Sequence, residues 1–257
     1  MAPAKCGPAS IANVATLKLT LTLDGILILR RMCGRTRLSV PPGDLADVFE
    51  APLVPSPNPN DAVNLNCAPT DPILVVRRKR DSDLRELVAM RWGLVPFYVA
   101  DFRDCKPMIN ARVETVATNR AFRDSFKKRR CLVVADGFYE WRHEGKKKLP
   151  HVIQRADGRP FGLAGIWDRW KGVLHGKQER IETCAVITRN PTAEVAAVHD
   201  RMPLVIDTKD HEAWLDPKTD VAMLHDILDH RYVKDWIVTP IETMPASSRK
   251  RQMALFA

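Results

Sequence analysis

The sequence lacks the paired cysteines and histidines that hold metal ions in many proteins. Its six cysteines are isolated, with no Cys-x-x-Cys pair, and its seven histidines form no His-Glu-x-x-His motif. A zinc site needs several such ligands brought together, usually at short spacings. We therefore expect no metal and no other cofactor. Isolated cysteines are also typical of reduced thiols, which predicts a cytoplasmic protein.

The sequence also lacks a hydrophobic run long enough to cross a membrane. Its most apolar stretch, Leu17 to Leu29, is interrupted by Lys18 and Asp24, whereas a bilayer core needs about 20 apolar residues in succession. A basic region and a small-residue cleavage site, which a signal peptide would carry, are missing. We expect a protein without membrane contact.

Residues 1–31 differ in amino-acid composition from the rest of the chain. We interpret them as a leader or as a segment upstream of the true start, with translation beginning at Met32. The alternative is a β-hairpin, because leucines alternate from Leu17 to Leu23 before the turn-forming pair Asp24-Gly25.

The charge balance is basic. Forty Lys and Arg residues against 31 Asp and Glu give a net charge of +9 and a pI near 9.4. This favours a polyanionic partner on electrostatic grounds. The 45% apolar and 28% charged residues are ordinary for a globular protein and exclude wholesale disorder.

Neither an internal repeat nor a regular strand–helix alternation is present, which argues against a doubly wound parallel sheet. We expect an α+β fold that is mostly antiparallel. Alternation and β-branched residues predict strands at 73–77, 86–91, 131–135, 137–142, 151–155, 161–167, 181–188 and 232–239. Helices are predicted at 44–50, 119–129, 192–198, 209–215 and 220–228. In the second of these helices, Phe122 and Phe126 share one face and should rest on the sheet.

Five short segments combine reactive or charged side chains with Gly, Pro and aromatic residues, a mixture typical of active-site loops. They are Met32-Cys33-Gly34-Arg35, Arg91-Trp92-Gly93-Leu94-Val95-Pro96, Asn110-Ala111-Arg112-Val113-Glu114-Thr115, Asp136-Gly137-Phe138-Tyr139-Glu140-Trp141 and His199-Asp200-Arg201-Met202-Pro203. In this order, and with Asn66-Cys67-Ala68-Pro69 and Gly165-Ile166-Trp167-Asp168, they resemble the SOS response-associated peptidase (SRAP) family, also called abasic-site processing proteins.

The resemblance implies a single SRAP domain over 32–240 with a barrel-like, mostly antiparallel β core and a few short helices, followed by a tail at 241–257. It also implies a monomer that recognises abasic sites in single-stranded DNA. In such proteins the initiator Met is removed and a cysteine, here Cys33, becomes the first residue. The departures from the family pattern are the residues that precede Cys33, together with Cys67 and Val113 inside their blocks.

The chemistry explains why the terminal position matters. A terminal cysteine offers a thiol with a pKa of about 8.5 and an α-amine with a pKa of about 7.7 to 8.0. The amine can form an imine with the aldehyde of an opened abasic sugar, and the thiol then closes a thiazolidine. The family resemblance assigns proton transfer to Glu140 and His199, and hydrogen bonding to Asn110. Phosphate binding is assigned to Arg35, Arg112 and Arg201.

Each of these residues also has an ordinary structural explanation. Cys33 alone would be a core residue, Glu140 a carboxylate paired on a sheet, His199 a helix end and Asn110 a turn residue. Trp92, with Pro96 and Phe97, fits either an apolar wedge that stacks on bases or a core tryptophan.

Three functions follow from these assignments. The first is a covalent sensor of abasic sites with lyase-like chemistry. The second is a cysteine peptidase that only removes its own leader, with Cys33 as the nucleophile. The third is a single-strand binder that forms no covalent bond.

Overall fold

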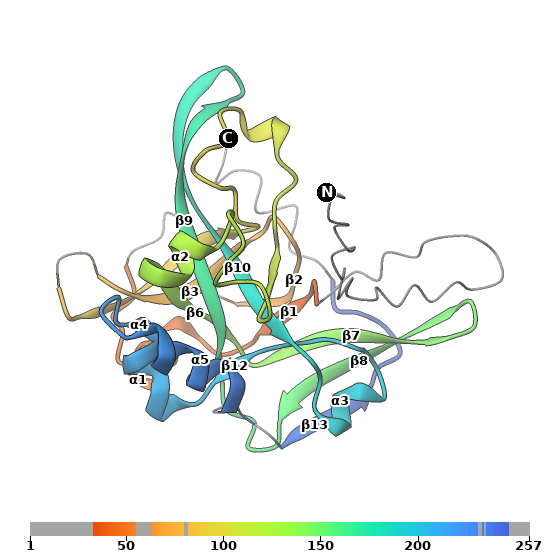
Figure 1. The fold of residues 1–257 in the computed structure, drawn as a ribbon. Helices are drawn as coiled ribbons and strands as arrows, with labels where there is room; N and C mark the ends of the chain where they lie inside the picture. The colour runs from red at the N-terminus through yellow and green to blue at the C-terminus, as the bar shows by residue number, and fades with distance from the viewer. Residues whose placement is uncertain (1–32, 55–62, 80–81, 231–232, 234, 247–257) are drawn as a thin grey trace, which may run out of the picture. The chain divides into compact units, whose positions relative to one another are not determined.

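The computed structural model describes residues 33–54, 63–79, 82–230, 233 and 235–246 (Figure 1). The alternative hairpin that begins at Leu17 and most of the predicted tail lie outside these residues. The boundaries proposed for the leader, the domain and the tail stay predictions.

Five long strands close into a barrel. They are β3 (Pro72–Arg78), β4 (Arg85–Trp92), β6 (Arg130–Ala135), β9 (Phe161–Leu174) and β10 (Lys177–Arg189). Hydrogen bonds link them in the order β10-β4-β3-β6-β9, and pairing of β9 with β10 completes the ring. The β10–β4 pair is parallel and the other pairs are antiparallel. The expected α+β fold with a barrel-like core is therefore confirmed, with one parallel pair in the ring.

A second sheet contains five antiparallel strands in the order β13-β8-β7-β1-β2. Its members are β1 (Thr36–Leu38), β2 (Asn64–Cys67), β7 (Gly137–Glu144), β8 (Lys147–Arg155) and β13 (Trp236–Pro240). Only Asp136 lies between the end of β6 in the barrel and the start of β7, so the barrel leads directly into this sheet.

Three very short strands attach to the barrel strands. They are β5 (Asn110–Arg112), β11 (Met202–Pro203) and β12 (Val205–Ile206). β5 runs parallel to β10, and β11 and β12 pair with β10 and β9, respectively. The sequence did not predict these strands or β1 and β2, because two to four residues are too few to show alternation.

Side-chain alternation along β6 divides the core into two clusters. Leu132 and Val134 belong to one cluster, whereas Cys131, Val133 and Ala135 belong to the other. Successive residues of a strand point to opposite faces, and both faces of β6 are covered, so all six of its residues are buried. This explains why β6 is apolar from Cys131 to Ala135.

The helices are α1 (Pro42–Phe49), α2 (Arg123–Lys128), α3 (Ala193–Ala196), α4 (His211–Leu215) and α5 (Val221–His230). Each lies within or beside a predicted range. The helix predicted over 119–129 begins only at Arg123, because the Asn119 side chain accepts a hydrogen bond from Ala121 N and forms a turn. Phe122 and Phe126 are both buried, as the amphipathic pattern predicted.

The strand β9 has 14 residues, twice the predicted length, and β10 has 13 residues where 181–188 was predicted. Beyond the barrel they continue as a two-stranded hairpin with Leu174 opposite Lys177 (Figure 1). The β10 residues Lys177 to Arg180 are all exposed, so this part of the strand carries no apolar signal in the sequence.

Candidate active site

Four side chains that are distant in the sequence meet beside the barrel. Cys33 precedes β1, Asn110 opens β5, Glu140 lies in β7 and His199 follows α3. All four are less than 9% exposed. These are the four residues that the family resemblance assigned to catalysis, and the fold brings them together from different parts of the chain.

Backbone pairing brings Cys33 to Glu140. β1 lies beside β7 with Thr36 opposite Phe138, and Tyr139 N donates a hydrogen bond to Arg35 O at 2.9 Å. Asn110 is held on the other side, where β5 pairs with β10 and Asn110 lies opposite Val186. The site is therefore built at the junction between the second sheet and the barrel.

Cys33 is almost completely enclosed. It is 1% exposed, and its carbonyl oxygen accepts a hydrogen bond from Asn110 Nδ2 at 2.8 Å. Burial raises the pKa of the thiol well above its ordinary value, and the neighbouring Glu140 raises it further. The thiol is therefore protonated at neutral pH in this structure.

Glu140 is a buried carboxyl group whose proton affinity is increased. The side chain is 2% exposed, and burial raises its pKa from 4.5 to about 8. A hydrogen bond with Cys33 opposes this shift, while the charge of Asp200 adds to it. Near neutral pH the group therefore holds a proton that it can donate, and it can take one back within the physiological range.

His199 lies behind Glu140. Its Nε2 atom is 3.9 Å from Glu140 Oε2, and its Nδ1 atom is 3.1 Å from the main-chain nitrogen of Arg201. Nδ1 is also 3.1 Å from the main-chain oxygen of Arg201, so it accepts a hydrogen bond from the Arg201 amide in one tautomer and donates one to the carbonyl in the other. Asp200 Oδ1 lies 3.2 Å from Nδ1. The imidazole and the carboxyl can thus exchange a proton after a small movement.

Two buried acceptors in the site have no hydrogen-bond partner among the described residues. They are Asn110 Oδ1 and Glu140 Oε1. Burying such an atom without a partner costs about 1 to 3 kcal/mol. Unpaired acceptors beside a cysteine fit a site that receives donors from a bound molecule, such as hydroxyl or amine groups.

The arginines predicted to bind phosphate lie in different settings. Arg112 is exposed at the end of β5, two residues from Asn110. Arg35 is partly buried and donates to Asn66 Oδ1 at 2.8 Å. Arg201 is held by Glu114, with Nη1 to Oε1 at 2.6 Å and Nη2 to Oε2 at 3.0 Å.

Arg201 makes two further hydrogen bonds, to Asn190 Oδ1 and to Thr188 O. Its guanidinium group is thus occupied by protein acceptors, whereas Arg112 is open to solvent. The structure leaves phosphate binding by these residues as a prediction.

Trp92 is a core residue in the structure. It is 0% exposed, and its indole nitrogen donates to Ile109 O at 2.9 Å. Pro96 is also buried. The exposed aromatic side chains of this segment are Phe97 and Tyr98, which are 56% and 43% exposed. Neither Trp92 nor Pro96 exposes a side-chain face on which a base could stack.

Sequence reasoning missed several side-chain contacts, of which the one between Asn66 and Arg35 involves a predicted site residue. Asn66 orients Arg35, and its Nδ2 atom donates to Pro245 O at 2.6 Å. The Tyr98 ring packs against its neighbour Phe97 and lies under the Arg120 guanidinium at 4.6 Å. Asn66 stood in a recognised block, but its link to the C-terminal residues has no local signature.

The part of the chain that the structure describes contains no cluster of three or more His, Cys, Asp or Glu side chains able to hold a metal ion. In the same residues, none of the helices has the length and hydrophobicity to span a bilayer.

Comparison with known proteins gives a consistent result. The sequence model of the family "SOS response associated peptidase (SRAP)" matches residues 32–246. The abasic site processing protein YoaM of Bacillus subtilis is 34% identical over 188 residues, which cover 73% of this chain and 80% of YoaM. The abasic site processing protein YedK of Escherichia coli is 34% identical over 188 residues, covering 72% of this chain and 79% of YedK.

A solved structure of a protein from Bacteroides thetaiotaomicron has the same fold. It superposes with a TM-score of 0.70 at 26% identity and covers 82% of this chain and 93% of its own. The barrel, the site beside it and these matches lead to one conclusion: the chain belongs to the SOS response-associated peptidase family.

Proposed function

We propose that this protein recognises abasic sites in single-stranded DNA and binds to them covalently through Cys33, once Cys33 is the first residue of the mature chain. One observation carries the proposal. Cys33, Asn110, Glu140 and His199 share one buried site although up to 166 residues separate them. The names of the matched relatives, abasic site processing proteins, indicate the lesion.

The proposed reaction needs no redox partner. The α-amine of Cys33 attacks the aldehyde carbon of the opened sugar, and loss of one water molecule gives an imine. The thiol sulfur then adds to the imine carbon while the thiol proton passes to the nitrogen. A C–S bond forms, the C=N bond becomes single, and the product is a five-membered thiazolidine.

The raised pKa of the thiol fits this sequence of steps. A protonated thiol is a poor nucleophile, so the amine reacts first, provided that it is unblocked. Glu140 is placed to manage both proton transfers, because it contacts the thiol and holds a proton near neutral pH. His199 can supply or accept that proton through Nε2.

Asn110 acts as a positioning residue for Cys33. Its amide nitrogen fixes the Cys33 carbonyl group, and its Oδ1 atom is left free of partners among the described residues. The free oxygen is available to a donor on the substrate, such as the sugar hydroxyl or the attacking amine.

Contacts with the rest of the strand are proposed for Arg112 and for the exposed pair Phe97 and Tyr98. Arginine binds phosphate through a planar fork, and aromatic faces stack on bases without reading their sequence. Such contacts suit single-stranded DNA, whose bases are accessible.

The same site bears on the alternative of a peptidase that removes only its own leader. Peptidase chemistry at Cys33 needs a thiolate, and the burial described above opposes ionisation. In the structure the imidazole faces Glu140. The geometry therefore favours amine chemistry, and a cleavage that frees the amine would precede it.

An oligonucleotide with one abasic site tests the proposal. A chain expressed from Met32, so that removal of Met exposes Cys33, should form an adduct that survives denaturing electrophoresis. The full chain with residues 1–31 retained should form none. Mass spectrometry of each preparation identifies its first residue.

Two variants refine the test. Cys33→Ala should abolish the adduct and retain reversible DNA binding, because the phosphate contacts lie elsewhere. Glu140→Gln should slow adduct formation by about 10- to 100-fold at similar DNA affinity. A denaturation-resistant adduct with Cys33→Ala would show that another residue is the nucleophile.

A further inference from the structure

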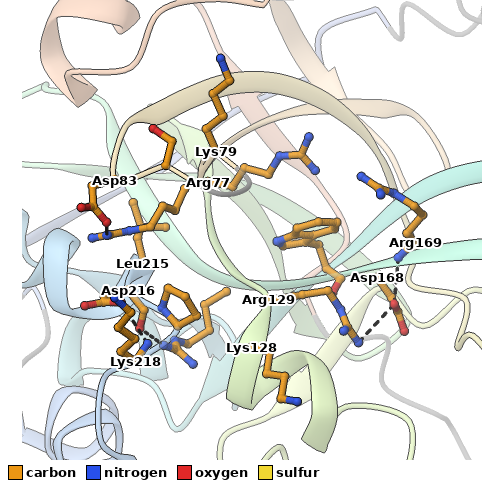
Figure 2. Close-up of a pocket in the computed structure, with 15 residues that line it drawn as sticks. Arg77, Lys79, Asp83, Lys128, Arg129, Asp168, Arg169, Leu215, Asp216 and Lys218 are labelled. Atoms are coloured by element: carbon orange, nitrogen blue, oxygen red, sulfur yellow. Dashed lines mark hydrogen bonds and ion pairs between the residues drawn. The ribbon is translucent and has the colours of Figure 1, made fainter.

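A large basic cavity lies away from Cys33. It has a volume of about 780 Å³ and is lined by the end of β3, the chain around the start of β6, the middle of β9 and the loop after α4. Of its 15 lining residues, eight are Lys or Arg and three are Asp. Figure 2 shows these side chains gathered from the different elements.

Part of this positive charge is used inside the protein. Arg77 pairs with Glu86 at 2.7 Å and with Glu182 at 2.8 Å. Arg129 Nη2 lies 3.2 Å from Asp168 Oδ1, a contact drawn as a dashed line in Figure 2. These paired arginines shape the wall of the cavity rather than supply free charge.

Arg130 has a structural task as well. Its guanidinium group donates to four main-chain carbonyl oxygens, those of Phe126, Lys127, Trp214 and Asp216. These carbonyls lie at or just beyond the C-terminal ends of α2 and α4. Unpaired carbonyls there need donors. Arg130 therefore holds two walls of the cavity together.

Lys79, Lys128 and Lys218 supply the available charge. All three line the cavity and are exposed, and none is joined by an ion pair to another described residue. Lys128 ends α2, and Lys218 lies in the turn after α4. Lys128 and Lys218 therefore lie on two different walls of the cavity.

The cavity also has an aromatic wall. Trp167 lines it, and the Arg77 guanidinium lies 4.6 Å from the centre of the Trp167 ring. Arg77 covers one face of the ring, so a base would stack on the opposite face while the neighbouring cations neutralise phosphates.

The cavity and the candidate active site lie at opposite ends of β3. Arg77 and Arg78 end this strand, whereas Pro72 begins it beside Arg91, the neighbour of Trp92. The Trp92 indole in turn contacts Ile109, the residue before Asn110. Six residues of extended chain span about 20 Å, which corresponds to several nucleotides of an extended strand.

We propose that this cavity binds phosphates of the DNA strand at a distance from the lesion, with Lys128 and Lys218 as the main cationic contacts. That the strand is DNA rests on the proposed function. The cavity would hold undamaged strand, and its contribution does not depend on chemistry at Cys33.

The test measures reversible binding of an undamaged single-stranded oligonucleotide to the full chain at several salt concentrations. Each phosphate contact on a single strand contributes a slope of about 0.7 to the fall of log K with log salt. The double variant Lys128→Gln/Lys218→Gln should lower the slope by about 1.4 and weaken binding by roughly 25-fold at 0.1 M salt.

The matched control is Lys171→Gln/Lys177→Gln. These lysines are exposed on the β9–β10 hairpin and do not line the cavity, yet the variant loses the same net charge. It should change the slope by much less. Equal effects of the two double variants would mean that only the net charge of the protein matters, and would overturn the proposal. An unchanged slope in the first variant would overturn it as well.

Photo-crosslinking locates the strand directly. An oligonucleotide with 5-iododeoxyuridine at each position in turn should crosslink to the peptide that contains Trp167. Crosslinks that map only to peptides around Cys33 would also overturn the proposal. Adduct formation on an abasic oligonucleotide is scored separately, so a failure of the Cys33 chemistry is distinguishable from a failure of the cavity.

Discussion

Replacing Glu140 by glutamine should change how stability depends on pH. Burial raises the pKa of the Glu140 carboxyl from 4.5 to about 8. The unfolded chain releases this proton near the ordinary pKa of glutamate. Between these values the folded protein binds one more proton than the unfolded chain, so the free energy of unfolding falls as the pH rises.

The structure sets the size of the effect. One pH unit corresponds to about 1.4 kcal/mol, so the interval from 4.5 to about 8 corresponds to a loss of about 5 kcal/mol. Glutamine is neutral at every pH and resembles the protonated carboxyl. The free energy of unfolding of Glu140→Gln, relative to the unmodified chain, should therefore rise with pH from about 4.5 and level off above about 8.

Urea unfolding at unit intervals from pH 5 to pH 9 measures this difference. Effects of the other titrating groups cancel to a first approximation, because they are common to both proteins. Glu179→Gln, which removes an exposed carboxyl group, is the matched control. A difference that stays constant across this range would mean that Glu140 is already ionised in the folded protein, and its role as a proton donor would have to be withdrawn.

Three further substitutions have defined outcomes. Asn110→Ala removes the donor to the Cys33 carbonyl and should slow adduct formation at least tenfold while lowering the free energy of unfolding by about 1 kcal/mol; an unchanged rate on a denaturing gel would refute the positioning role. Gly93→Ala should destabilise by about 2 kcal/mol or more in urea, because φ is +132° and the new Cβ atom would lie 2.6 Å from Pro107 Cβ. Arg130→Met should lower the free energy of unfolding by about 3 kcal/mol, since buried carbonyl oxygens lose their donors; thermal unfolding at an unchanged temperature would contradict that account.

Sequence patterns predicted the long elements because their signal is local. All five barrel strands and all five helices were anticipated, since a run such as Cys131 to Ala135 in β6 is apolar without interruption. Strands of two to four residues carry no period. The extension of β9 and β10 beyond the barrel was missed because exposed polar residues form it.

The residues of the site were predicted from motifs, whereas their environments were not. The ion pair of Arg201 with Glu114 joins positions 87 residues apart, and no local pattern announces it. The segment around Trp92 fitted a core and a stacking surface equally well, because an apolar side chain serves either purpose. The cavity near Trp167 draws on four separate elements, so the basic runs in the sequence indicated charge but no common location.

Closure of the barrel has a consequence for solubility. A ring of strands has no unpaired edge on which another copy could add a strand, and edges are where β-rich proteins aggregate. Among the described residues, the second sheet ends at β2 and β13, and β13 is only five residues long and finishes at Pro240, which cannot donate a hydrogen bond. Strand-by-strand association is thereby disfavoured at the barrel ring and at β13.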